Sequence, residues 1–141
     1  MRTIALMTHD FSLAVKSFII HNEKLLLLRR NFTNPHKPGG WDIPGGRLDK
    51  GENPFDGLRR ETKEETGLEI TILHPLGVQH FVRDDQQRIT MLIFLCTPEH
   101  TQITLSPEHD LYQWAPLTPE HIPSWLHHEL GTFNTLFKHQ I

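Results

Sequence analysis

One stretch in the middle of this 141-residue chain carries most of the information, and over residues 46–68 it reads GRLDKGENPFDGLRRETKEETGL. Its second half has the start and stop signals of a helix. Asn53 is a favoured N-cap residue, and Pro54 suits the first helical position. Gly67 is a favoured residue just after the last turn of a helix. The sequence therefore predicts a helix over residues 54–66.

The predicted helix separates its side chains into three faces, because successive residues turn by about 100°. One face should pack on the core, a second should be basic and a third acidic. The three faces hold, respectively, Phe55, Leu58 and Thr62; Arg59, Arg60 and Lys63; and Glu61, Glu64 and Glu65. The acidic face is the one that needs a chemical explanation.

Glutamates three or four positions apart on a helix repel each other, at a cost of roughly 0.2–0.5 kcal/mol per pair. A divalent cation turns that repulsion into coordination, since Mg²⁺ prefers carboxylate oxygens and water. A solvated acidic surface is the ordinary alternative. Gly45 and Gly46 favour the cation, because glycine lets the backbone approach a ligand closely. Glu52 precedes the helix and should reach the same place, so we expect the acidic groups to converge on a site for metal and phosphate.

The same stretch resembles the signature of the Nudix hydrolase family. That signature is a Gly, five residues, a Glu, seven residues and then Arg-Glu-aliphatic-x-Glu-Glu-x-Gly-aliphatic. The matching positions here are Gly46, Glu52, Arg60, Glu61, Glu64, Glu65, Gly67 and Leu68. Thr62 departs from the pattern, since it stands where the family has an aliphatic residue. Because threonine has the shape of valine, we expect a small packing cost and no loss of chemistry.

The resemblance implies a single Nudix domain over residues 1–141, with an α/β/α sandwich fold and a mixed β-sheet. It implies a divalent-metal-dependent hydrolase that cleaves a diphosphate linkage in a nucleoside triphosphate or another nucleoside diphosphate derivative. Mg²⁺ is the implied cofactor, with Mn²⁺ as the alternative. The implied metal ligands are the Gly45 carbonyl, Glu52, Glu61, Glu64, Glu65 and Glu108.

The resemblance also implies roles in catalysis. Glu64 and Glu65 would act there as well as in metal binding, and Arg60 would hold the carboxylates in place. Glu108, six residues ahead of Trp114, resembles a downstream catalytic glutamate of several family members. It is therefore a candidate for the general base or a further metal ligand. Asp110 and Glu99 are its rivals, and a plain surface acid is the simpler interpretation.

Residues for substrate binding are suggested by the neighbouring segments. Arg29 and Arg30 end an apolar strand and point to opposite faces, so one of them should contact phosphate. Trp41 is a candidate for stacking on a base, with packing in the core or a loop as the alternative. The window at 84–86 lacks the Pro or Tyr typical of the ADP-ribose and dinucleoside polyphosphate subfamilies, which disfavours both substrates.

Alternating and apolar runs predict strands over residues 12–21, 24–30, 69–82, 88–97 and 112–117, the third of them bent near Pro75 and Gly77. One or two short helices should follow within residues 119–139. Strands on both sides of the central helix suggest a mixed sheet covered by helices. The segment 43–46 should be irregular because of its proline and glycines.

Composition limits the partners. The formal net charge is −3 with scattered Lys and Arg, which argues against binding to nucleic acid. No apolar run approaches the roughly 18 residues of a membrane span, and the segment Thr3–Met7 lacks the layout of a signal peptide. Cys96 is the only cysteine, so no internal disulfide forms, and a cytoplasmic location is expected. The expected partner is a small nucleotide-like molecule; the oligomeric state stays open, a homodimer included.

Two other functions remain alternatives on the same fold. An isomerase of isoprenyl diphosphates would need a cysteine in the cleft, whereas Cys96 lies in an apolar strand and is expected to be buried. A non-catalytic nucleotide sensor would be expected to lose carboxylates of the signature, and all of them are present. The eleven histidines show no metal-binding spacing and are expected mostly at the surface.

Overall fold

The computed structural model describes residues 11–141; the segment Thr3–Met7 lies outside them. Two 3₁₀ turns, at Pro119–His121 and Ser124–Leu126, lead into the last helix. The strands and helices, in chain order, are β1 (Phe11–His21), β2 (Lys24–Arg30), β3 (Trp41–Asp42), β4 (Gly45–Arg47), α1 (Pro54–Thr66), β5 (Ile70–Val82), β6 (Arg88–Pro98), β7 (His109–Pro116) and α2 (His127–Leu136).

The sheet is mixed and is organised around β1. Over most of its length β1 pairs with β6 in parallel, and only its last two residues pair with β2. On the same edge of β1, where β2 is no longer paired, residues Ala14–Lys16 pair with β4. β5 continues the sheet beyond β6, while β3 and β7 pair with β2. The sheet thus opens between β1 and β2, and the segment that leads into β4 fills the opening.

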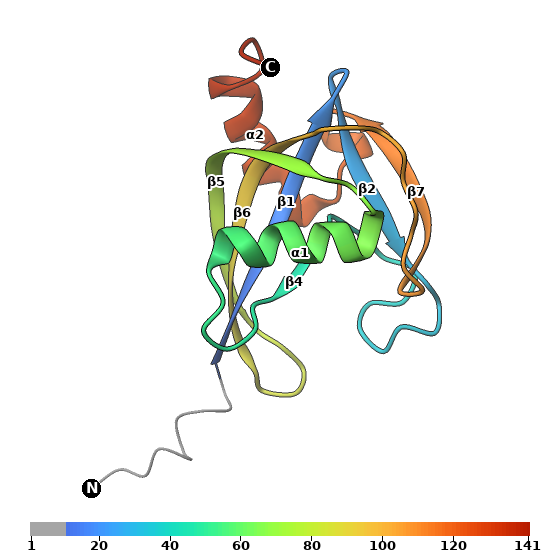
Figure 1. The fold of residues 1–141 in the computed structure, drawn as a ribbon, viewed down its shortest axis with the longest axis vertical. Coiled ribbons are helices and arrows are strands. Elements are labelled where there is room, and N and C mark those ends of the chain that lie inside the picture. The colour runs from blue at the N-terminus through green and yellow to red at the C-terminus, as the bar shows by residue number, and fades with distance from the viewer. Residues whose placement is uncertain (1–10) are drawn as a thin grey trace, which may run out of the picture.

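Helices cover both faces of this sheet, and each face has its own apolar core. The two helices lie on opposite sides of β1, α1 across the front and α2 behind (Figure 1). Val15, Ile19 and Leu58 belong to the core under α1, whereas Phe18 and Phe133 belong to the core under α2. Alternate residues of β1 therefore supply the two cores, as the two-residue period of a strand requires. The predicted α/β/α sandwich with a mixed sheet is confirmed.

Helix α1 has the predicted bounds and both predicted end signals. The side chain of Asn53 accepts a hydrogen bond of 2.8 Å from the backbone N–H of Phe55. Gly67 has a φ of 75°, the left-handed conformation that glycine adopts without a steric penalty, and its N–H donates to the carbonyl of Lys63. Both helix ends are therefore set by local sequence.

Three expectations about local structure are corrected. Phe55 was expected on the core face of α1, yet it is 46% exposed, and its ring lies against that of Phe94. The segment 43–46 was expected to be irregular, but Gly45–Arg47 forms β4, since these residues pair with β1. β7 also begins earlier than expected, at His109. Tertiary pairing, which local sequence does not encode, decides the last two.

Thr62 is buried on the core face of α1, as expected, but its hydroxyl has a partner. Its Oγ1 lies 2.9 Å from the Oγ of Ser17, which also donates to the carbonyl of Pro44 at 3.2 Å. The departure from the aliphatic pattern thus contributes a polar link between α1, β1 and the turn before β4.

Replacing Thr62 with valine is expected to lower the free energy of unfolding by about 1 kcal/mol, since it deletes one buried hydrogen bond. The turnover rate should not change, because the hydroxyl is not part of the acidic face. Urea unfolding of Thr62→Val, Ser17→Ala and the double variant would measure the coupling. A stability equal to that of the wild type would show that the Ser17–Thr62 contact contributes nothing.

Candidate active site

Glu65 is the most deeply buried carboxylate of the acidic face. It is 7% exposed, and its Oε1 accepts a hydrogen bond of 2.8 Å from the backbone N–H of Gly45. Burial raises its pKa to about 8, because a charged carboxylate loses solvation there, while Lys16 and the Gly45 N–H act in the opposite direction. A fixed carboxylate of this kind is stabilised in its charged form by a nearby cation.

Glu61 lies one turn earlier on α1 and is partly buried. Burial raises the pKa of its carboxyl, while Arg60 acts in the opposite direction. A Cβ on Gly46 would stand only 2.7 Å from Oε2 of Glu61, so β4 approaches the carboxylate closely because Gly46 has no side chain. Two neighbouring carboxylates therefore face the backbone of β4 at the place where the sequence predicted a metal-phosphate site.

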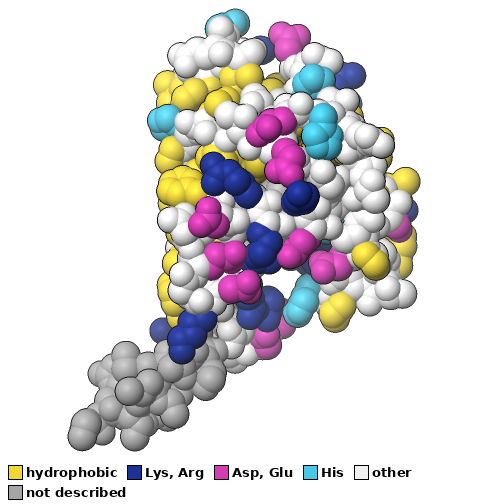
Figure 2. Space-filling view, in the orientation of Figure 1, with side chains coloured by type: hydrophobic (Ala, Val, Ile, Leu, Met, Phe, Trp, Pro, Cys, Tyr) yellow, Lys and Arg dark blue, Asp and Glu magenta, His cyan; other side chains and the backbone are white. Residues whose placement is uncertain are grey.

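Arg60 joins three of the acidic groups. It donates to both carboxylate oxygens of Glu52, at 2.8 and 2.9 Å, and its Nη1 lies 3.1 Å from Glu61 and 3.3 Å from Glu64. The hydrogen bonds from Arg60 lower the pKa of Glu52 to about 2. The expected separate basic face is therefore wrong for Arg60, because its side chain is long enough to reach the acids of the neighbouring sector. Figure 2 shows acidic and basic side chains mixed across the face that α1 covers.

The carboxylates do not close into a cage. No three His, Cys, Asp or Glu side chains of residues 11–141 are grouped so that they could hold a metal ion. Glu52 and Glu64 are instead paired with Arg60, and Glu64 is largely exposed. Of the predicted ligands, the structure thus brings together Glu61, Glu65 and the backbone of Gly45 most closely.

A second polar cluster, formed by Lys16, Arg30 and Asp42, lies beside the turn that precedes β4. Asp42 is buried and accepts hydrogen bonds from Lys16, from Arg30 and from the N–H of Ile43. Burial would raise the pKa of Asp42, but the two cations outweigh it and keep the pKa below its usual value. The cluster carries one positive charge in excess, which suits a phosphate group next to the carboxylates.

Sequence reasoning did not identify Lys16, Asp42 or His109. Lys16 is the one charged residue in the apolar run 12–20, and that interruption was the available signal. His109 is buried rather than exposed, which corrects the expectation for it, and its Nδ1 has no hydrogen-bond partner in this structure. Burial lowers the pKa of its imidazole. Nothing in its neighbourhood along the chain indicates that it is buried.

The two arginines at the end of β2 point in different directions, as expected. Arg30 binds Asp42 and therefore faces the turn before β4. Arg29 instead forms an ion pair with Asp110 and lies over the ring of Phe32. Of the two arginines, Arg30 is the one near the acidic site.

Glu108 is exposed, on the loop between β6 and β7. Two backbone hydrogen bonds hold that loop in place. The N–H of Ser106 donates to the carbonyl of Glu65 at 3.2 Å, and the N–H of Asn31 donates to the carbonyl of Glu108 at 3.0 Å. Glu108 thus lies between the end of α1 and the end of β2. Within residues 11–141, its side chain forms no hydrogen bond or ion pair with the residues of the acidic face.

Trp41 lines a cavity of about 590 Å³ on the face toward α2. Trp125 also lines it, and Gln113 and Lys37 add polar groups. Trp41 also packs against the core under α2. The volume of the cavity is that of a typical small-molecule site, which generally lies between about 300 and 1,000 Å³.

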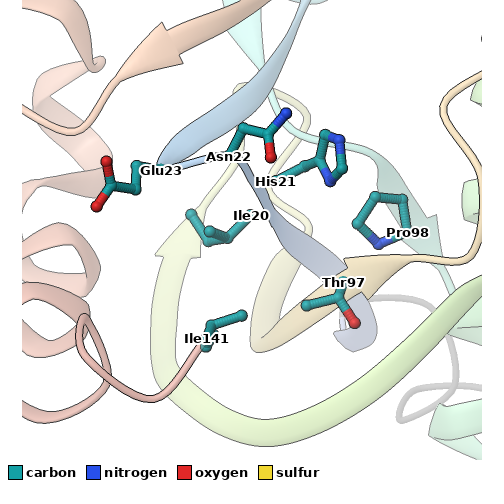
Figure 3. Close-up of a pocket in the computed structure, with 7 residues that line it drawn as sticks. All are labelled: Ile20, His21, Asn22, Glu23, Thr97, Pro98 and Ile141. Carbon is teal, nitrogen blue, oxygen red and sulfur yellow. The ribbon is translucent and has the colours of Figure 1, made fainter.

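A further cavity, of about 550 Å³, lies at the other end of the molecule. It is bordered by the turn between β1 and β2, the end of β6 and the C-terminal Ile141 (Figure 3). Figure 1 shows that turn and the C-terminus together, away from β4. This cavity is remote from the acidic face, and we assign it no role.

The fold and the acidic face define a class: an α/β/α protein in which a glycine-rich strand faces helix glutamates. The NUDIX domain model matches residues 11–130, and the chain therefore belongs to the Nudix hydrolase family. It is 31% identical over 111 residues to a MutT-like protein of Streptomyces ambofaciens, which covers 79% of this chain and 66% of that protein. It is 32% identical over 88 residues to the nucleoside triphosphatase NudI of an Enterobacter species, covering 55% of this chain and 62% of that one.

The fold agrees with solved structures. A MutT protein from Methanosarcina mazei superposes with a TM-score of 0.79 at 26% identity, covering 91% of this chain and 96% of the other. The two curated relatives above are each matched over at most about two thirds of their own length. No helix among residues 11–141 has the length and apolarity needed to cross a membrane.

Cys96 is fully buried in the core under α1, as expected. Burial raises the pKa of its thiol to about 12, so it is protonated and inaccessible at neutral pH. This placement removes the cysteine acid/base that the isomerase alternative requires.

Proposed function

We propose that this protein hydrolyses a diphosphate linkage in nucleoside triphosphates or related nucleoside diphosphate derivatives, with a divalent cation as cofactor. The observation that carries the proposal is the buried Glu65 beside Glu61, both facing the glycine backbone of β4. The similarity to NudI, a nucleoside triphosphatase, supports the substrate class.

The residues present fit a hard divalent cation. Glu61 and Glu65 both have raised pKa values, so a cation nearby would relieve the cost of their negative charges. Their carboxylates and the Gly45 carbonyl would hold it, and all of these are oxygen donors of the kind that Mg²⁺ and Mn²⁺ prefer. When bound, the cation supplies charge neutralisation for the diphosphate and lowers the pKa of water. Glu52 and Glu64 are proposed to contribute to metal binding, Glu64 also to catalysis, and Arg60 holds both.

The other parts of the site would position the nucleotide. Arg30, which is partly exposed, would contact a phosphate oxygen while still bound to Asp42. A nucleobase would enter the cavity lined by Trp41 and Trp125, where an aromatic face and the amide of Gln113 are available. Arg29 would contribute only at the rim, since it is held by Asp110.

The proposal is tested by a panel of nucleoside triphosphates, nucleotide sugars and dinucleoside polyphosphates, each incubated with Mg²⁺ and analysed by mass. We expect release of a nucleoside monophosphate and pyrophosphate, or the corresponding pair of phosphate-bearing products. A reaction in ¹⁸O-labelled water would place the new oxygen and identify the bond that is broken. No turnover of any member of the panel with Mg²⁺ or Mn²⁺ would contradict the proposed function.

We propose that Glu108 accepts the proton of the attacking water, because the carboxylates of α1 are engaged with Arg60, Gly45 or the cation. Glu108→Gln should then lower kcat by roughly 100-fold or more with little change in KM, within the usual range of general base catalysis. The matched control is Glu99→Gln on the same loop. If Glu108→Gln keeps its full rate while Glu64→Gln does not, the base belongs to α1.

A further inference from the structure

The buried ammonium group of Lys16 lies beneath the segment 42–45, which connects β3 to β4. Its Nζ lies 3.1 Å from each carboxylate oxygen of Asp42, 3.2 Å from the carbonyl oxygen of Ile43 and 3.5 Å from that of Gly45. In the sheet, Lys16 is also the register partner of Gly45. One side chain of β1 therefore contacts three residues of a single turn.

An ammonium group has three N–H donors and no acceptor. Asp42, Ile43 and Gly45 provide three acceptor groups within reach, so every donor of Lys16 is directed at the turn. No donor is left over for a substrate phosphate. Lys16 therefore differs from Arg30, whose side chain also binds Asp42 but is partly exposed.

The turn that Lys16 holds presents two backbone groups to the acidic site. The Gly45 N–H donates to Glu65, and the Gly45 carbonyl is the oxygen assigned above to the cation. We propose that Lys16 is a positioning residue that fixes both groups of Gly45 against Glu65. The inference rests on the proposed function for its catalytic consequence, but the geometry of the turn is independent of it.

The test compares Lys16→Met, which keeps the length of the side chain and removes charge and donors, with the wild type. Asp42 should stay bound to Arg30, so the fold should survive. Amide hydrogen exchange at Gly45, followed by NMR, is expected to become at least several-fold faster. Mn²⁺ binding, followed by electron paramagnetic resonance, is expected to weaken by roughly tenfold, the usual effect of losing a residue that orients a metal ligand.

The matched control is Glu129→Gln, which replaces a buried carboxyl group of α2 in the other layer, where Glu129 accepts from Gln79. It should change neither Gly45 exchange nor Mn²⁺ affinity. Unchanged exchange and unchanged affinity in folded Lys16→Met would overturn the inference. If the wild type binds no Mn²⁺, the proposed function fails, and Gly45 exchange alone still decides the role of Lys16.

A second variant applies if Lys16→Met does not fold. Lys16→Arg keeps the charge and the pair with Asp42, but a planar guanidinium cannot direct donors from one atom at three acceptors. We expect a folded protein with faster exchange at Gly45 and weaker Mn²⁺ binding than the wild type. Values equal to the wild type would show that only charge is needed and would overturn the positioning role.

Discussion

Replacing Glu65 with glutamine is expected to lower kcat by roughly 100-fold or more while the protein still folds. Partners that only orient a metal ligand already cost about 10–100-fold when they are lost, and a ligand itself should cost more. The glutamine keeps an oxygen that can accept from the Gly45 N–H, so the turn before β4 should stay in place. The loss then reports the missing charge, and steady-state kinetics with Mg²⁺ would measure it.

The matched control is Glu69→Gln, just beyond α1, where the carboxylate is exposed and pairs with Lys63 at 2.8 Å. This variant should keep the wild-type rate. Circular dichroism and thermal unfolding would establish that both variants are folded. A Glu65→Gln enzyme with the kcat of the wild type would refute the role given to this residue.

The parts of the fold that sequence predicts well are those encoded within a few residues. Helix α1 begins and ends where Asn53, Pro54 and Gly67 indicate, because capping is a local property. The bounds of β2 and the bend in β5 follow in the same way from an apolar run and from Pro75 and Gly77. The sandwich itself required the resemblance to a family, since strand order is a long-range property.

The parts that sequence does not predict depend on partners distant along the chain. The pairing of Lys16 with Asp42 joins residues 26 positions apart, and nothing near either residue specifies it. Gly45–Arg47 form the strand β4 because they pair with β1. Their own sequence does not favour a strand, since it is rich in glycine. His109 is buried for the same kind of reason, by the sheet around it.

The structure shows how the predicted site residues lie relative to one another, and Arg60 differs from what its spacing on the helix predicts. Spacing alone placed Arg60 with Arg59 and Lys63, whereas the family resemblance placed it with the carboxylates, where the structure has it. A helical projection treats side chains as points, and a long guanidinium reaches across the boundary between two faces. The roles of Glu64 and Glu108 in catalysis remain predictions that the variants above test.

Removing divalent cations is expected to abolish turnover, and restoring Mg²⁺ or Mn²⁺ should recover it. Water attacks a diphosphate anion slowly unless charge is neutralised and a hydroxide is made available. Lys16 and Arg60 are already bound to carboxylates of this chain, and Arg30, which would contact a phosphate oxygen, cannot lower the pKa of the attacking water as a divalent cation does. Product release followed after adding excess EDTA, and then excess Mg²⁺, would measure the effect. Full turnover in EDTA would exclude a cation-dependent mechanism.

Metal removal should also expose a pH dependence of stability that comes from Glu65. Its pKa is raised to about 8 in the folded chain, from an ordinary value of 4.5, because burial disfavours the charge. Between those values the folded state binds more protons than the unfolded state, so the free energy of unfolding falls as pH rises from about 4.5 to about 8. The stability that the protonated Glu65 contributes is complete below pH 4.5 and is lost as the pH rises past about 8.

Saturating Mg²⁺ should reverse this pH dependence of stability, because it binds the deprotonated carboxylate. Urea unfolding between pH 5 and pH 8.5, with EDTA and with Mg²⁺, would measure both slopes, and Glu65→Gln should flatten them. A stability in EDTA that rises over this range equally in both proteins would show that Glu65 is charged throughout.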